Sequence, residues 1–280
     1  MDLETVLDTV AQYYAQNISP YLVADYQGEP FQRFGLSHLI VLGITLLLIL
    51  LILLTRQKLD AEDKASLREV MAQILIINEI ISYLWLYFYQ GIDTVKMIYG
   101  IPITIIPVSL LSIFAWISAF MLLKKSQKLY ELTYLIGILV ALYALIFPDL
   151  ALYGFPHYRF FYTFISPAII LLSAIYMSVA EEEIELGWKS LLRVFLTANI
   201  FMAIVFGLNT YFGGNYLYLN AKPAGNLLLD LLPDYPIYLL YLEGIGIVGG
   251  VLLYLPFIVR DGFRKRNLRA DTTRIDKYIQ

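Results

Sequence analysis

The sequence predicts an all-α membrane protein with seven transmembrane helices. Of its 280 residues, 59% are hydrophobic and only 15% are charged, whereas soluble domains carry about 25% charged residues. Seven apolar runs also come close to the roughly 20 residues that a helix needs to cross a bilayer. These runs are Leu36–Leu54, Val70–Tyr89, Ile101–Leu123, Leu129–Phe147, Phe160–Ala180, Ser190–Phe212 and Pro236–Val259.

The lysines and arginines predict how the helices are oriented. Counted over the segments between the seven runs, they alternate between rich and poor segments, with 16 on one side of the membrane and 4 on the other. Basic residues are enriched on the cytoplasmic side of membrane proteins. We therefore expect the C-terminus in the cytoplasm and the N-terminus outside.

Three regions follow from this pattern. Residues 1–35 form an extracytoplasmic segment, in which apolar residues at helical spacing predict a short amphipathic helix on the membrane surface. Residues 36–259 form the seven-helix membrane domain. Residues 260–280 form a basic cytoplasmic tail suited to anionic lipid rather than to nucleic acid.

Local signals predict how some segments begin and end. Ser66 and Glu69 have the spacing of a capping box at the start of the second helix. The acidic stretch 180–189 is typical of a solvated connection. In the loop before the last span, the run LLLDLL predicts a short half-buried helix.

Polar residues within or beside the apolar runs are the candidate ligand-binding residues. A carboxylate at the bilayer centre costs roughly 2.5–3.5 kcal/mol and marks a functional site by default. Most of the candidates fall in the predicted outer half of the membrane, which predicts a polar cavity open to the outside. The candidates are Glu79, Ser109, Ser112, Asp149, His157, Arg159, His38, Asn209 and Glu243.

Several of these residues have simpler interpretations. His157 and Arg159 suit a solvated position at the interface, where they would meet lipid phosphates. His38 suits the end of a helix, and Asn209 and Asn215 suit anchors of a loop.

The sequence also excludes some chemistry. It has no cysteine, which excludes disulfides and thiolate nucleophiles. It contains no phosphate-binding glycine loop, no HExxH and no GxSxG motif. We predict neither a metal site nor a cofactor, and no nucleic-acid partner.

Four stretches carry a family resemblance: FQRFGLSH, PDLALYGFPHYRFFYTFIS, NYLYL and YLLYLEGIGIVGGVLLYLPF. With these the chain resembles the YwaF-like family of bacterial integral membrane proteins, which implies a multi-pass protein of a bacterial plasma membrane. That family is distantly similar to an animal transmembrane acyltransferase of ether phospholipids, in which a cysteine and a histidine are thought to carry the acyl group.

The chain departs from its relatives at those catalytic positions. Where relatives read LPLHLCSI, this chain reads IPVSLLSI, so that Ser109 and Leu111 replace the histidine and the cysteine. Where relatives read FISH, this chain has FISP, with Pro167. The comparison argues against an intact acyl-transfer site. Serine could serve as nucleophile only with a base in reach, and His38 and His157 are the candidates.

Three functions remain open at this stage. The first is binding of membrane lipid or another amphipathic ligand in the outward-facing cavity. The second is a transporter or channel in which Glu79 and Glu243 relay protons or cations. The third is a membrane assembly or interaction subunit, whose protein partners the sequence does not reveal.

The predicted orientation has a direct test. A reporter enzyme that works only in the cytoplasm, fused after Gln280, should be active, because the basic residues place the C-terminus there. The companion reporter that works only outside the cytoplasm should be inactive at the same fusion point. The reverse pair of results would invert the whole topology.

Overall fold

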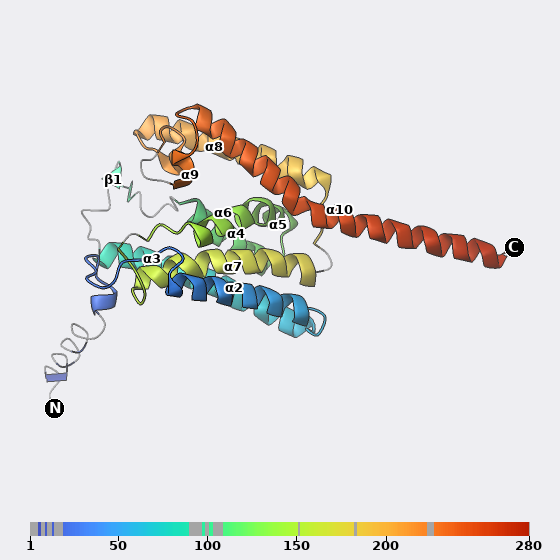
Figure 1. The fold of residues 1–280 in the computed structure, drawn as a ribbon, viewed down its shortest axis with the longest axis horizontal. Helices are drawn as coiled ribbons and strands as arrows, with labels where there is room; N and C mark the ends of the chain where they lie inside the picture. The colour runs from blue at the N-terminus through green and yellow to red at the C-terminus, as the bar shows by residue number, and fades with distance from the viewer. Residues whose placement is uncertain are drawn as a thin grey trace. The chain divides into compact units, whose positions relative to one another are not determined.

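Within its described residues, the computed structural model is helical apart from one antiparallel pair of two-residue strands, β1 (Met97–Ile98) and β2 (Ile101–Pro102) (Figure 1). The predicted amphipathic helix of residues 1–35 falls largely outside the described part. The described residues are 5–6, 9, 13, 19–89, 97–98, 101–102, 109–150, 152–181, 184–222 and 227–279.

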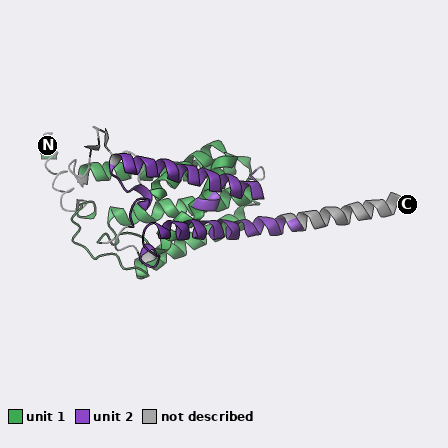
Figure 2. Cartoon of the chain, turned by 90° about the horizontal axis from the view of Figure 1, so that it is seen from above, with its two compact units in different colours: residues 1–133, 137–183 green, residues 134–136, 184–280 purple. Residues whose placement is uncertain are grey.

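The chain divides into two compact units, coloured separately in Figure 2. Unit 1 comprises residues 1–133 and 137–183, and unit 2 comprises residues 134–136 and 184–280. Unit 2 holds α8 (Trp188–Phe212), α9 (Leu227–Asp230) and α10 (Ile237–Ile279). The four-residue α9 lies in the loop where a short helix was predicted. The helix α10 continues through the region predicted as a separate tail.

Unit 1 is organised around one helix, α7 (Tyr158–Ala180). This helix packs against four others of the unit, and 67% of its apolar core segment is buried. Its neighbours are α2 (Leu36–Thr55), α3 (Ala61–Tyr89), α4 (Leu110–Lys124) and α6 (Ile138–Ile146). A side chain of α7 therefore meets other helices on most of its faces.

A close approach of helices occurs at Gly137, where a π-helical turn joins α5 (Gln127–Leu132) to α6. A methyl group added at Gly137 would lie 3.0 Å from the ring of Phe114 and 3.5 Å from Ile170. The contact with Phe114 is tight and the one with Ile170 is ordinary van der Waals contact, so glycine leaves space that the α4 side chain uses.

Six helices are long and apolar enough to cross a membrane within the described residues. They match six of the seven predicted runs, with ends shifted by a few residues, except that α3 begins nine residues early and α10 continues well past its predicted end. Of the seventh run, Ile101–Leu123, the described residues form β2 at Ile101–Pro102 and the helix α4 from Leu110. A helix of 15 residues is about 22 Å long, shorter than the roughly 30 Å hydrocarbon core. The count of seven full spans thus stays a prediction.

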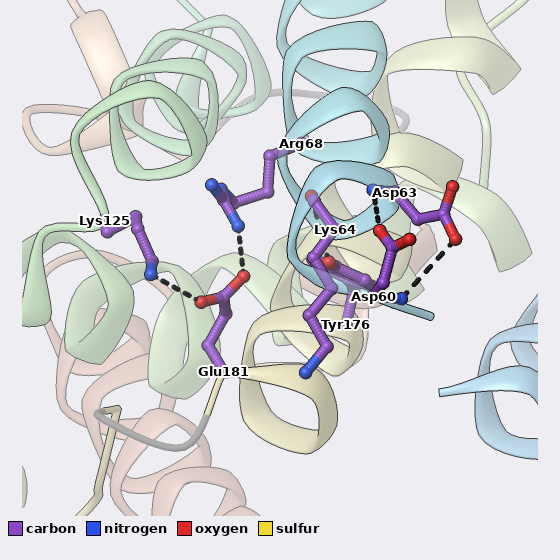
Figure 3. A network of polar contacts seen from close by, with 7 residues as sticks. All are labelled: Asp60, Asp63, Lys64, Arg68, Lys125, Tyr176 and Glu181. Carbon is purple, nitrogen blue, oxygen red and sulfur yellow. Dashed lines mark hydrogen bonds and ion pairs between the residues drawn. The ribbon is translucent and has the colours of Figure 1, made fainter. Parts of the chain in front are cut away.

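The predicted start of the second helix is wrong. The helix α3 begins at Ala61, before Ser66, because an aspartate pair caps it instead. The Asp63 backbone N–H donates to Asp60 Oδ1 at 2.8 Å, and the Asp60 N–H donates to Asp63 Oδ2 at 3.4 Å (Figure 3). This reciprocal arrangement satisfies two N–H groups that a helix start leaves open.

The prediction of a solvated acidic stretch after α7 is also wrong for its first acidic residue, Glu181. Glu181 is buried, with 7% of its surface exposed, and its carboxylate pairs with Arg68 of α3 and with Lys125 at the end of α4 (Figure 3). Lys125 Nζ lies 2.8 Å from Glu181 Oε2. One carboxylate therefore ties the ends of three helices together.

We predict that Glu181→Ala destabilises the protein by about 3 kcal/mol, because it leaves Arg68 nearly buried and without its carboxylate. Thermal unfolding of the purified protein measures this. Asp234→Asn is the control, since the side chain of Asp234 is fully exposed and lies 3.8 Å from Lys222, a kind of pair that contributes little. Equal losses in both variants would contradict the role given to Glu181.

Candidate functional site

The most buried carboxylate in the middle of a predicted span is Glu79 on α3. Only 1% of its surface is exposed. Its Oε1 accepts hydrogen bonds from Tyr162 OH and Ser166 Oγ of α7, each at 3.4 Å. Its Oε2 is buried and receives no hydrogen bond from any described residue. Among the described side chains no cation pairs with it.

Asn78 fixes the neighbouring part of α7. Its Nδ2 donates to Ser166 Oγ at 2.8 Å and to the Tyr162 carbonyl at 3.3 Å. Ser166 is fully buried, and the next residue, Pro167, has no N–H. The Thr163 carbonyl, four residues earlier, therefore lacks its helical donor. Polar oxygen atoms are thus concentrated on α7 opposite Glu79.

A chain of hydroxyl groups leads from this point to the start of α4. The Ser112 and Tyr162 hydroxyl oxygens lie 3.4 Å apart, and Ser109 Oγ donates to Ser112 Oγ at 2.9 Å. Ser109 also caps α4, because its Oγ accepts the Ser112 backbone N–H at 3.0 Å. The two predicted serines are therefore brought together with Glu79 through Tyr162.

Arg159 lies one turn from Tyr162 on α7. Its guanidinium carbon is 5.1 Å from the ring centre of Tyr162 and 5.4 Å from that of Trp85. Cation–π contacts of this kind hold a guanidinium in place without neutralising it. No carboxylate pairs with Arg159 in the part of the chain that the structure describes.

His157 has a structural role. It is fully buried, its Nδ1 accepts the Arg159 N–H at 3.0 Å, and its Nε2 lies 3.0 Å from the Val23 carbonyl. A carbonyl only accepts, so the proton is on Nε2. Trp85 and Tyr153 donate to the carbonyls of Leu22 and Ala24. These bonds hold residues 19–35, the strap, against α3 and the start of α7.

His38 is held in the same way. It is fully buried, its Nδ1 accepts the Phe34 N–H at 2.9 Å, and its Nε2 donates to the Leu145 carbonyl at 2.7 Å. Both nitrogens of each histidine are therefore engaged by backbone groups. Neither histidine has a nitrogen free to take a proton from Ser109.

The remaining candidates are Asp149 in unit 1 and Asn209 and Glu243 in unit 2. Asp149 is exposed and has no hydrogen bond or ion pair among the described residues. Asn209 is buried in unit 2 and holds its loop through two bonds with the Tyr216 backbone, while Asn215 bonds the backbone of Asn220 and Ala221. Both match the loop-anchor interpretation. Glu243 is half-buried on α10.

Sequence reasoning missed Tyr162 and Ser166, whose hydroxyl groups donate to Glu79 Oε1. A signal was present, because they are four residues apart and so share one face of α7. The sequence does not show that this face meets Glu79, because the packing of α3 against α7 is a tertiary contact.

The arrangement does not join Ser109 to either histidine through a described hydrogen bond. A serine nucleophile needs a base in hydrogen-bond reach, and Ser109 contacts Ser112 instead. Among the described residues, no group of three or more His, Asp or Glu could hold a metal ion. The site offers one carboxylate, several hydroxyls and one guanidinium within an apolar bundle.

Comparison with known proteins gives one match. The model of the TMEM164 family, a family of membrane proteins, matches residues 33–254. No curated protein and no solved structure matches the chain. The matched range includes every candidate residue discussed above.

The attachment of the strap should depend on pH. Burial lowers the pKa of His157 below its ordinary value of 6.5, the Val23 carbonyl opposes this shift, and the charge of Arg159 adds to it. As pH falls, His157 therefore takes up a proton at a higher pH in the unfolded state than in the folded state. The stability due to neutral His157 is present above about pH 6.5 and is lost as pH falls through the lowered pKa.

We predict that hydrogen exchange at residues 20–27, corrected for its intrinsic pH dependence, speeds up between pH 7.5 and 5.5. The control is His157→Gln, whose amide can donate to Val23 and accept from Arg159 without titrating. Exchange in this variant should stay flat with pH. The same pH response in parent and variant would exclude His157 as its source.

Proposed function

Because the chain belongs to the TMEM164 family of membrane proteins, we propose that it binds a membrane lipid or another amphipathic ligand beside Glu79 and Arg159. The single observation that carries this proposal is Arg159, a half-buried guanidinium held between two aromatic rings with no carboxylate paired to it. A guanidinium in this state is suited to a phosphate or carboxylate headgroup.

The surroundings of Arg159 supply the other half of an amphipathic site. The hydroxyls of Ser109, Ser112 and Tyr162 offer hydrogen bonds next to the cation. The helices that carry them are apolar along most of their length, so a ligand with acyl chains would find lipid-like surface beside a polar group. The orientation predicted by the basic residues would place this site at the outer face of a plasma membrane.

Two other functions are less well supported. A relay through Glu79 and Glu243 would have to join residues of two different units. An assembly subunit needs no buried carboxylate, which is costly to keep in a span. Residual acyl transfer would require a histidine to give up a backbone bond before it could act as a base.

Native mass spectrometry of the gently purified protein tests the proposal. We expect a phospholipid or fatty-acid adduct on the parent protein, and at least a tenfold weaker adduct on Arg159→Gln, because a charge-assisted contact contributes about 1.5–3 kcal/mol. Arg33→Gln is the matched control. Arg33 also stacks on a ring, Phe147, at 5.6 Å, but it is exposed.

A parent protein that carries no lipid would argue for the assembly role. An adduct of equal strength on Arg159→Gln would show that lipid binds elsewhere on the protein.

A further inference from the structure

We propose that Glu79, Tyr162 and Ser166 form a binding site for one sodium ion inside unit 1. This goes beyond lipid binding, because it assigns an inorganic ligand to the deepest part of the polar cluster and does not involve Arg159.

The first argument is charge. Glu79 is a nearly fully buried carboxylate that no described cation neutralises, and its Oε2 is left without a donor. Such an atom costs free energy in a low-dielectric interior. A proton on Oε2 would neutralise the charge, but it would have no acceptor among the described residues. A cation can contact both carboxylate oxygens at once.

The second argument is distance. Ordinary O–H···O hydrogen bonds are about 2.5–3.0 Å long. Here three pairs of oxygens share a spacing of 3.4 Å: Tyr162 OH and Ser166 Oγ with Glu79 Oε1, and Ser112 Oγ with Tyr162 OH. Oxygens that bind one cation at about 2.3–2.6 Å and at right angles lie about 3.3–3.7 Å apart. The two hydrogen bonds at Glu79 Oε1 are therefore long, and their length also matches the spacing of oxygens that share one cation.

The third argument selects the ion. Sodium has nearly the same radius as calcium but half its charge. One carboxylate with neutral hydroxyl ligands balances a single positive charge, whereas a divalent ion would leave an excess charge among apolar helices. Potassium is larger and would need wider oxygen spacing. Asn78 holds Ser166 in place, because its Nδ2 donates to Ser166 Oγ at 2.8 Å.

The experiment is thermal unfolding of the full chain in detergent, in NaCl, KCl or choline chloride at equal ionic strength and fixed pH. We expect Na⁺ to raise the melting temperature by about 3–6 °C over choline once its concentration exceeds Kd tenfold. K⁺ should give a clearly smaller shift. Glu79→Gln should remove the Na⁺ shift, because an amide carries no charge.

The control is Glu243→Gln, which changes the other membrane glutamate, in unit 2, and should keep the shift. Ser166→Ala provides a second test that does not depend on whether Glu79→Gln folds, and it should weaken the shift. Arg159→Gln should keep the shift even if lipid binding is lost, so the two proposals fail separately.

Three results would overturn the proposal. They are the absence of a Na⁺-specific shift in the parent protein, an equal shift with K⁺, and an unchanged shift in Ser166→Ala. Loss of the shift in Glu243→Gln would place the effect outside unit 1 and would overturn it as well.

Discussion

The need to satisfy polar groups inside an apolar bundle governs this structure. In the hydrocarbon region no water is at hand to replace a missing hydrogen bond, and each unsatisfied group costs several kcal/mol. The fully buried histidines show how the fold meets this need. His38 and His157 each bond to two backbone groups, so each ring joins segments far apart in sequence. The aromatic rings around them, including Phe31, Phe164, Tyr26 and Tyr153, fill the remaining space.

The sequence was sufficient to predict the six long apolar helices found among the described residues, because hydropathy over 20 residues is a strong local signal. It was less informative where a helix starts. Ser66 and Glu69 have the spacing of a cap, yet Asp60 and Asp63 cap the helix one and a half turns earlier. The local sequence does not show which of two capping pairs this close together is used. The helix predicted from Ile101 begins at Leu110, where Ser109 supplies the cap.

In the candidate site, too, the sequence predicted some residues and missed others. Glu79 stood out because a carboxylate in an apolar run is rare, and Arg159 and Ser112 were also found. Their partners Tyr162 and Ser166 were missed, because tyrosine and serine are common in spans and only the packing of α3 on α7 selects them. Glu181 was misjudged for the opposite reason. It lies in an acidic stretch that resembles a solvated turn, and its burial depends on Arg68 and Lys125, 113 and 56 residues away.

Glu79 and Glu181 are the two buried carboxylates that join α3 to α7, and they differ in how their charge is compensated. Glu181 meets two cations of the chain itself, so its environment is complete without any ligand. Glu79 meets only hydroxyl groups, which can orient a partner but cannot neutralise a charge. Arg159 is held by the rings of Trp85 and Tyr162 instead. Glu79 and Arg159 therefore belong to the same cluster but do not form an ion pair with each other. An ion pair between Glu79 and Arg159 would remove the free-energy cost of each uncompensated charge. Because the two are not paired, we favour a ligand that supplies the missing charges over a purely structural role.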